Sequence, residues 1–256
     1  MTRLLALTRA ITPALANCEL THIDRQPIDI AKAVAQHSAY ERLLESLDCT
    51  VQRVAAAPDL ADAVFIEDTA VVLDEIAIVA RPGVESRRRE VAAVAEALRP
   101  FRKITRVEAP ATLDGGDVLV AGRKIYVGQT ARTNASGREA LVRATVPLGY
   151  EVHAIPISKC LHLKSAVCLV AKDSVLLNPK WAWPEAFAGL KIVEVDPTEP
   201  YAANALMVGD SVVYAAEFPK TRQRLERHGL RVAPIEASEL AKAEGGVTCC
   251  SLLFQA

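Results

Sequence analysis

The sequence predicts an α/β fold in which five ββαβ repeats close into a ring, that is, a five-bladed α/β propeller. Three observations support this prediction. Short apolar runs come in close pairs, a helical segment and a third apolar run follow each pair, and the two ends of the chain together supply one more unit of this kind. A repeat of roughly 20–50 residues is typical of such arrays, and closing the ring hides the edges of the sheets.

The paired apolar runs predict β-hairpins, because they are rich in Val, Ile and Leu and their connectors are short. The pairs lie at 70–80, 117–128, 167–178 and 204–215. Their turns fall near Asp74, Gly122, Lys172 and Gly209.

A helical segment and a third β-like run follow each of these hairpins. The helices are expected at 86–98, 135–146, 219–228 and, in a shorter form, near 184–189. The third runs are ITRVE, YEVHAI, KIVEV and LRVAPI. Each stretch therefore follows the order β-β-α-β.

A fifth unit can be assembled from the two ends of the chain. Its strand pair would be 247–254 and 4–9, its helix 30–47 and its last strand 50–54. Asp29 is a candidate N-cap for the helix. Its buried stripe is expected to hold Ile30, Val34, Leu44 and Leu47.

The main alternative for the fold is a doubly wound α/β sheet. Such a sheet expects strands and helices in alternation, whereas here a hairpin precedes each helix. The pattern therefore favours the ring, and we expect residues 1–256 to form a single catalytic domain.

Composition narrows the function further. The 30 basic and 31 acidic residues nearly cancel to a net charge of -1, which argues against a nucleic-acid binder. No apolar run approaches the length of a membrane span. The six cysteines form no C-x-x-C pair, so we interpret them as reduced thiols in a cytoplasmic protein and expect no metal site.

Chemically reactive residue types recur at one place in the repeat, at or just before the first strand. These residues are Glu67 and Asp68, Asp114, His162 and Cys249. Arg87 and Arg132 share a second place, between the second strand and the helix. Equivalent positions of a propeller face the same end of its axis, so we expect these side chains to meet in one central pocket.

Each of these residues also has an ordinary explanation. A cysteine in such a chain is usually a small buried hydrophobe. His162 could be a buried histidine with satisfied hydrogen bonds, Arg87 part of a solvated helix face, and Asp114 a turn former beside glycines with unusual backbone angles. Taken without further information, the shared location predicts only a cysteine-dependent hydrolase or transferase.

The sequence resembles dimethylarginine dimethylaminohydrolases, which belong to the guanidine-modifying enzymes with a five-bladed α/β propeller (the pentein or amidinotransferase-like superfamily). The similar segments run nearly from end to end and in the correct order. They are ADAVFIEDTAVV, ARPGVESRRREV, TLDGGDVLVAGRKIYVGQTARTNASG, LHLKS, YAANAL and GGVTCCS.

The resemblance implies a role for each site residue. Cys249 would be the nucleophile, His162 the general acid and base, and Asp114 the carboxylate that orients the histidine. The substrate contacts implied are Asp68 on the guanidinium, Asp62 and Glu67 lining the site, Arg87 and Arg132 on the α-carboxylate, and backbone contacts from Leu20 and Ala243.

The implied reaction converts Nω,Nω-dimethyl-L-arginine to L-citrulline and dimethylamine, or the monomethyl substrate to citrulline and methylamine. A thiolate suits it, because it forms a covalent intermediate that divides a difficult displacement into two steps. No metal or organic cofactor is implied, the partner is a small-molecule substrate, and a homodimer is compatible with the sequence.

Cys250, next to the implied nucleophile, is a decoy. If 247–254 is a strand, adjacent side chains point to opposite faces, so only one of the two cysteines can enter the pocket. The resemblance selects Cys249.

Two other functions compete with this one. Arginine and agmatine deiminases resemble the chain around the cysteine and histidine, but they carry an aspartate two residues after the histidine, where this sequence has Lys164. A second carboxylate facing a dimethylated nitrogen would be desolvated without a partner, so its absence favours methylated substrates. A non-catalytic propeller that only binds a partner would be expected to lack the cysteine, histidine and acid.

Overall fold

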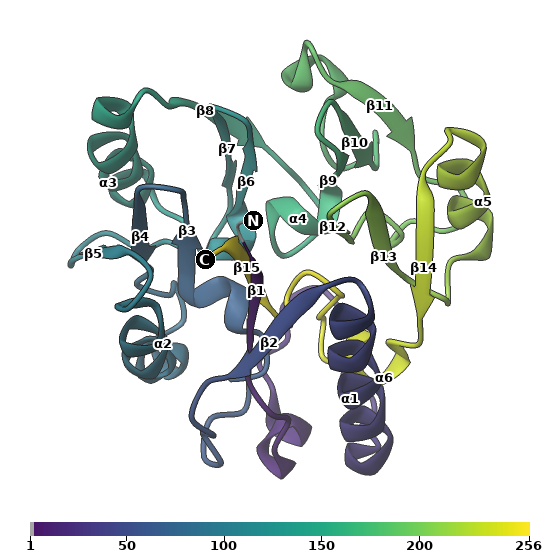
Figure 1. The fold of residues 1–256 in the computed structure, drawn as a ribbon, viewed down its shortest axis with the longest axis horizontal. Helices are drawn as coiled ribbons and strands as arrows, with labels where there is room; N and C mark the ends of the chain where they lie inside the picture. Colours follow the sequence, from purple (N-terminus) through teal and green to yellow (C-terminus); the bar gives the residue numbers. More distant parts are fainter. Residues whose placement is uncertain (1–2) are drawn as a thin grey trace.

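Five three-stranded sheets surround a common axis in the computed structural model, which describes residues 3–256 (Figure 1). Within each sheet the first strand is antiparallel to the second and the second is parallel to the third. The sheet orders are β3-β4-β5, β6-β7-β8, β9-β10-β11, β12-β13-β14 and β15-β1-β2. The predicted five-bladed α/β propeller of ββαβ units is confirmed.

The strand bounds agree closely with the predicted apolar runs, except that β15, predicted from residue 247, begins only at Leu252. They are β1 Leu4–Thr8, β2 Cys49–Arg53, β3 Ala70–Val72, β4 Ile76–Val79, β5 Lys103–Arg106, β6 Val118–Ala121, β7 Lys124–Gln129, β8 Glu151–Pro156, β9 Val167–Ala171, β10 Ser174–Leu177, β11 Lys191–Glu194, β12 Ala205–Val208, β13 Ser211–Ala215, β14 Arg231–Ile235 and β15 Leu252–Gln255.

Helices of two kinds connect the strands. The α-helices are α1 Ile30–Ser46, α2 Val91–Leu98, α3 Ala135–Thr145, α4 Leu163–Ala166, α5 Pro219–Arg227 and α6 Ser238–Ala241. The 3₁₀ helices are η1 Pro13–Asn17, η2 Ile66–Thr69, η3 Glu85–Glu90, η4 Gly115–Asp117, η5 Val146–Leu148 and η6 Pro184–Phe187. The third unit has only the short η6 where the others have an α-helix, because Pro184 opens a single turn that Gly189, in the left-handed region, closes.

The two ends of the chain close the ring as expected. Strand β15 pairs antiparallel with β1, placing Leu4 opposite Gln255, and β1 pairs parallel with β2. In Figure 1 these strands meet near the centre of the molecule. The fifth unit therefore joins residues that lie almost the whole chain apart.

The capping prediction for α1 is confirmed, but one residue of its predicted buried stripe is wrong. The Asp29 carboxylate accepts the backbone N–H of Lys32 at 3.0 Å. Val34 is 42% exposed, because the buried face of the helix runs through Ala33, Tyr40 and Leu44 instead.

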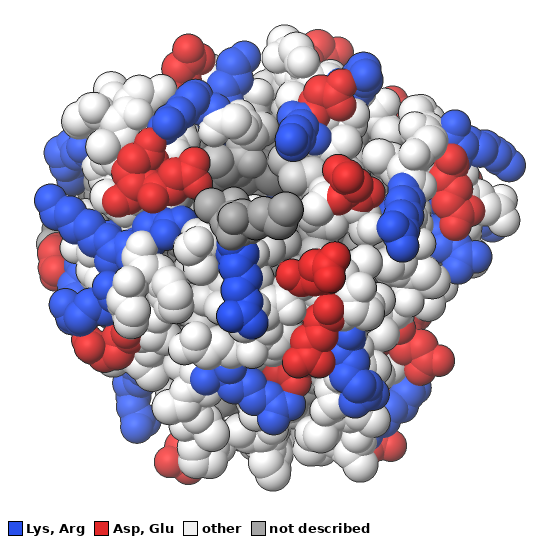
Figure 2. Space-filling view, viewed as in Figure 1, with Lys and Arg blue, Asp and Glu red and all other residues white. Residues whose placement is uncertain are grey.

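Apolar side chains from neighbouring units pack together and hold the sheets around the axis. One such cluster joins Ile78 of the first unit to Val127 of the second. Basic and acidic side chains are interspersed over the face seen in Figure 2, in keeping with the nearly zero net charge. Within residues 3–256 no helix combines the length and apolar character needed to cross a bilayer.

Candidate active site

The predicted catalytic residues lie in the segments that lead into the innermost strands. Asp68 is on η2 before β3, Asp114 directly precedes η4 and β6, and His162 directly precedes α4 and β9. Cys249 lies in the turn before β15. Backbone contacts bind these segments to one another: the N–H of Glu67 donates to the carbonyl of Cys249 at 3.1 Å. The structure therefore brings together residues from four of the five units.

His162 is buried between two carboxylates. Its Nε2 lies 3.0 Å from Asp114 Oδ2, and its Nδ1 lies 3.6 Å from Asp68 Oδ1. Burial alone would lower the pKa of the imidazole, but Asp68 and Asp114 outweigh burial and raise that pKa to about 9. The imidazole is therefore a cation at neutral pH, ready to act first as an acid.

The carboxylate of Asp68 is held in place by the protein around it. Its Oδ2 accepts Arg87 Nη1 at 2.5 Å, and its Oδ1 accepts the backbone N–H of Gly116 at 3.0 Å. Although burial favours its neutral form, His162 and Arg87 lower the pKa of Asp68 to about 2. A fixed anion thus lies beside His162, where a guanidinium can be bound.

Close packing, not unusual backbone angles, explains the two glycines that follow Asp114. Neither has a positive φ. A Cβ on Gly115 would lie 2.1 Å from the backbone oxygen of Glu67, and one on Gly116 would lie 2.5 Å from Asp68 Oδ1 and 2.8 Å from His162 Nδ1. The missing side chains allow the loops to approach one another.

The Cys249 side chain is half-buried and lines a cavity of about 630 Å³. Its Sγ lies 3.4 Å from the backbone nitrogen of Gly246 and 3.8 Å from Thr248 Oγ1. Burial, together with the negative charges of Glu67 and Asp68, raises the pKa of this thiol. In the free protein Cys249 is therefore a neutral thiol.

Cys250 faces the core, although not for the predicted reason. Residues 247–250 form turns, and the strand begins only at Leu252, so strand alternation does not separate the two cysteines. The turn is held by Thr248, whose backbone N–H donates to Asn204 Oδ1 at 3.1 Å. It directs Cys250 into an apolar cluster with no exposed surface, and Cys249 into the cavity.

The two arginines have very different surroundings. Arg132 Nη2 donates to Thr21 Oγ1 at 3.0 Å, and Nη1 lies 3.9 Å from Asp114 Oδ2. Among the described residues no carboxylate forms a hydrogen bond with this guanidinium. It is thus placed near the catalytic acids with donors to spare.

Arg87, in contrast, is engaged on every side. It donates to both oxygens of Glu90, to Asp68, and to the backbone oxygens of Asp62 and Phe65. The resemblance implied that Arg87 holds a substrate carboxylate. Contact with such a ligand would require these buried ion pairs to open; the carboxylate role of Arg87 stays a prediction, and its hydrogen bond to Asp68 holds that side chain in place.

A loop between η1 and α1 closes beside the site, and two acids hold it there. Both Asp62 oxygens accept the backbone N–H of Glu19, at 3.2 and 3.3 Å. Glu244 accepts the N–H groups of Thr21 at 2.7 Å and His22 at 3.0 Å. Asp62 thus holds the backbone of this loop through its carboxylate.

Leu20 and Ala243, for which backbone contacts were implied, lie on this loop and in the segment that packs against it. Leu20 is partly buried on the loop, and Ala243 is buried in the segment that follows α6. Both pack on one apolar cluster. Their contact with a substrate stays a prediction.

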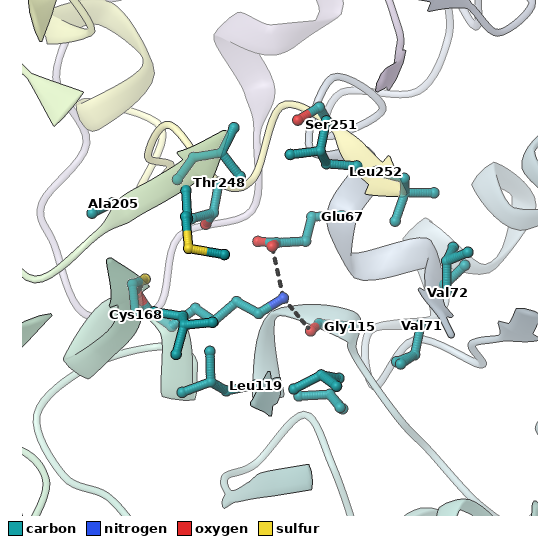
Figure 3. A pocket seen from close by; sticks show the side chains of 18 residues that line it. Glu67, Val71, Val72, Gly115, Leu119, Cys168, Ala205, Thr248, Ser251 and Leu252 are labelled. Carbon is teal, nitrogen blue, oxygen red and sulfur yellow. Dashed lines mark hydrogen bonds and ion pairs between the residues drawn. The ribbon is translucent and has the colours of Figure 1, made fainter. Parts of the chain in front are cut away.

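Glu67, which the resemblance places in the lining of the site, forms an ion pair with Lys164. Its Oε1 accepts Lys164 Nζ at 2.7 Å, and this Nζ also donates to the backbone oxygen of Gly115 at 3.3 Å. The pair lines a separate cavity of about 210 Å³ among the inner strands, together with Cys168, Thr248 and other side chains (Figure 3). The Glu67 carboxylate thus has a basic partner in this cavity, and its charge still acts on the Cys249 thiol, whose pKa it raises.

Two buried acids next to the site, Glu90 and Asp117, were not predicted from the sequence. Glu90 pairs with Arg87, and Asp117 bonds the segments that carry Arg132 and His162. The signal for Asp117 was its place in LDGGD, three residues after Asp114. Glu90, three residues after Arg87 in a charged cluster, gave no comparable signal.

One group of side chains has the composition of a metal site. Ligand atoms of Asp68, Asp114 and His162 lie within 4.8 Å of one another. These atoms already pair with each other, and the guanidinium of Arg87 lies against Asp68. A divalent cation would have to displace the histidine's ion pairs and would face a fixed positive charge, so the group fits a cationic imidazole better than a metal.

Comparison with known proteins gives close relatives. No protein-family model matches the chain. An N(G),N(G)-dimethylarginine dimethylaminohydrolase of Streptomyces coelicolor is 41% identical over 96% of this chain and 95% of that protein. A cysteine-to-serine variant of the Pseudomonas aeruginosa enzyme, solved with citrulline, has a TM-score of 0.93 at 33% identity and covers 99% of this chain and 100% of that one. A histidine-to-glycine variant, solved as an adduct with S-methyl-L-thiocitrulline, has a TM-score of 0.94 at 33% identity with the same coverage.

Proposed function

Because this chain belongs to the dimethylarginine dimethylaminohydrolase family, we propose that it hydrolyses Nω,Nω-dimethyl-L-arginine to L-citrulline and dimethylamine, and the monomethyl substrate to citrulline and methylamine. The observation that carries the proposal is His162, a cationic imidazole between two carboxylates in loops that also hold a half-buried thiol. That set can activate a sulfur nucleophile and protonate an amine without a cofactor.

Substrate binding prepares the nucleophile. In the free site burial and nearby carboxylates keep Cys249 protonated. A guanidinium bound at Asp68 offsets that negative field with positive charge, which lowers the pKa of the thiol and sends its proton to solvent. The thiolate thus forms mainly when its target is present.

Two chemical steps follow. The Cys249 sulfur forms a bond to the central guanidinium carbon, and the bond from carbon to the methylated nitrogen breaks as that nitrogen takes a proton from His162. The ring nitrogen that Asp114 does not bond faces Asp68, so it is the one placed to give this proton. The now neutral His162 then takes a proton from water, whose oxygen bonds the central carbon as the bond from carbon to sulfur breaks. The proton left on that oxygen goes to the departing sulfur, and citrulline results.

The amino-acid end of the substrate is assigned to Arg132. Its guanidinium is buried beside the catalytic acids and keeps free donors, which suits a charge-assisted grip on an α-carboxylate. Leu20, Asp62 and Ala243 support this end through the loop that closes beside it. Arg87 acts by holding Asp68.

An arginine deiminase activity is not favoured. The position two residues after His162 carries Lys164, whose Nζ bonds Glu67, so no second carboxylate faces the guanidinium from there. Arginine bound like dimethylarginine would leave N–H donors without partners, each costing about 1–3 kcal/mol. We expect a preference for the methylated substrate of at least about tenfold in kcat/KM.

Initial rates with dimethylarginine and arginine, at matched low concentrations, test this function. Citrulline, dimethylamine and ammonia are measured separately for the native protein and for the variants Cys249→Ser and Cys250→Ser. We expect citrulline and dimethylamine in equal amounts, loss of turnover by about 10³-fold or more in Cys249→Ser, and most activity retained in Cys250→Ser. Equal turnover of arginine would instead make the protein a deiminase.

We further propose that residues 1–256 act as one catalytic domain in the cytoplasm. Four of the five units contribute to one site, and the six cysteines are all free thiols. A catalytic thiol is preserved best in a reducing compartment. A homodimer is an expectation that size-exclusion chromatography with light scattering would test.

A further inference from the structure

Asp117 is a fully buried acid that the reaction does not use directly. It ends η4, three residues after Asp114, and its carboxylate accepts hydrogen bonds from two separate segments of the chain. Its burial raises its pKa to about 6. A buried charge that costs this much desolvation is retained only where its contacts compensate.

One of these contacts reaches the segment of the catalytic histidine. Asp117 Oδ1 accepts the backbone N–H of Leu163 at 3.1 Å. Leu163 directly follows His162 and begins the helix α4. The bond therefore fixes the peptide plane from which the imidazole extends.

The other contacts reach the loop of the substrate-binding arginine. Asp117 Oδ2 accepts the hydroxyls of Thr130 at 2.5 Å and Thr133 at 2.6 Å, on either side of Arg132. The Thr130 hydroxyl oxygen in turn accepts the backbone N–H of Arg132 at 3.1 Å. The Thr133 hydroxyl oxygen accepts the backbone N–H of Asp114 at 3.2 Å.

These bonds require a carboxylate. The Thr130 oxygen already accepts two backbone N–H groups, those of Arg132 and Thr133, so its hydroxyl can only donate; the Thr133 hydroxyl, whose oxygen accepts the N–H of Asp114, donates to the same atom, Asp117 Oδ2. An asparagine has one acceptor atom and one donor atom in place of the two oxygens. It could not satisfy Leu163 and both threonines together.

Strand β7 passes close enough to Asp117 that only a glycine fits. A Cβ on Gly128 would lie 2.8 Å from Asp117 Oδ1 and 3.1 Å from Leu163 Cβ. The carboxylate therefore has little freedom to move away from its partners, and its hydrogen bonds define a single geometry.

We propose that Asp117 is a positioning residue of this site, which holds the segments of His162, Asp114 and Arg132 in register through three hydrogen bonds. The proposal rests on the proposed function for the identity of the reaction. The general acid His162 and the carboxylate-binding Arg132 lie on different units, and their segments share one buried hydrogen-bond acceptor, the carboxylate of Asp117.

Variants at Asp117 and Thr133 test the proposal. Asp117→Asn is expected to lower kcat and raise KM together, with a loss in kcat/KM of about 10²-fold, because small misplacement of reacting groups has effects of this size. Thr133→Val should lose about tenfold and Thr133→Ser, which keeps the hydroxyl, less than about threefold.

Thr145→Val is the matched control for the threonine variants. Thr145 lies in the same unit, is equally buried, and donates its hydroxyl to the backbone oxygen of Leu141 at 2.8 Å within α3. Its loss should lower Tm without changing kcat/KM. All variants are compared with the native protein, so absence of native turnover would contradict the proposed function and not this inference.

A substrate-independent measurement completes the test. Asp68, Asp114 and Asp117 are the acids whose charges raise the pKa of His162. In an NMR titration of the free protein, Asp117→Asn should therefore lower the His162 pKa, whereas Thr145→Val should not. If Asp117→Asn lowers Tm but leaves kcat, KM and the histidine titration at native values, the inference is overturned. If that variant does not fold, equal activity of Thr133→Val and Thr133→Ser overturns it.

Discussion

Glu67 and Asp68 are neighbours in the chain, yet their carboxylates lie in two different regions of the propeller interior. Asp68 faces His162 in the loops that precede the inner strands. Glu67 pairs with Lys164 in a cavity lined by those strands themselves (Figure 3). The comparison shows that nearness in sequence and chemical type do not decide function here. What decides it is which partner each acid meets.

The cavity at Glu67 is a region in which charge is neutralised locally. Burial alone would lower the pKa of Lys164, but Glu67 outweighs burial and raises it, so the ammonium group stays charged. Glu67 Oε2 is buried and has no hydrogen-bond partner among the described residues. The adjacent space of about 210 Å³ can hold ordered water there. Asp68, in contrast, lies beside two groups that take part in the reaction, His162 and Cys249, and raises the pKa of each.

Two adjacent glycines offer the sharpest test of this comparison, and the largest expected effect. In Gly116→Ala the new methyl group would push on Asp68 and His162, and we expect kcat/KM to fall by about 10²-fold. In Gly115→Ala it would meet the backbone of Glu67, which cannot move aside as a side chain can, so we expect a large drop in Tm. Steady-state kinetics and thermal unfolding of both variants check this. Native kinetics in Gly116→Ala would contradict the site geometry.

Arg132 and Arg87 extend the comparison, because Arg87 forms buried ion pairs with Asp68 and Glu90 whereas Arg132 has no hydrogen-bonded carboxylate among the described residues. Arg132→Ala should raise KM by at least about tenfold with a smaller change in kcat, because it removes a carboxylate anchor and no reacting group. Arg87→Ala would leave Asp68 and Glu90 buried without their partner, a destabilisation of about 3–5 kcal/mol. Denaturant unfolding and KM measurements separate the two. An Arg87→Ala protein of native stability with a raised KM would restore the carboxylate role to Arg87.

The pH dependence of kcat/KM tests the charge state of His162. Because the carboxylates favour the imidazolium, its pKa is raised to about 9, and the acid needed in the first step is lost as the pH rises through that value. Asp114→Asn removes one negative charge, so the descending limb should move to lower pH by about 1 unit. Asp173→Asn, at an exposed acid paired with Lys191, is the control and should leave the limb unchanged. A limb that moves upward in Asp114→Asn would refute the assignment.

The propeller could be predicted from the sequence because its signals are local and repeated. Hairpins with short connectors recur, and only the pairing of β1 with β15 required combining distant segments. The C-terminal run was predicted as a strand from 247, yet its first residues form turns. Apolar composition alone did not reveal that Asn204 holds the backbone of Thr248 in a turn.

The catalytic set was predicted more completely than the partners of its charges. Asp114, His162 and Asp68 meet as expected. The roles of Glu67 and Arg87 depend on side chains from other segments, Lys164 and Asp68, whose positions become known only when the chain is folded. A repeat pattern shows which residues reach the axis, but not which charges neutralise each other there.

The smallest expected effect on activity concerns the cavity pair, Glu67 and Lys164. Lys164→Met or Glu67→Gln alone leaves one buried group without its partner and should lower Tm markedly. The double variant should recover much of that loss, because removing both charges also removes their desolvation cost. Because Glu67 and Lys164 pair with each other, removing both leaves the net charge beside the site unchanged, and kcat/KM of the double variant should stay within about threefold of native. One change with a definite sign is expected: loss of the Glu67 charge lowers the pKa of the Cys249 thiol, so alkylation at fixed pH should become faster. Thermal unfolding, steady-state kinetics and alkylation rates of the three variants test these expectations.

A double variant with native Tm but a tenfold or greater loss in kcat would place Glu67 with Asp68 in the reaction and remove the distinction between the two regions.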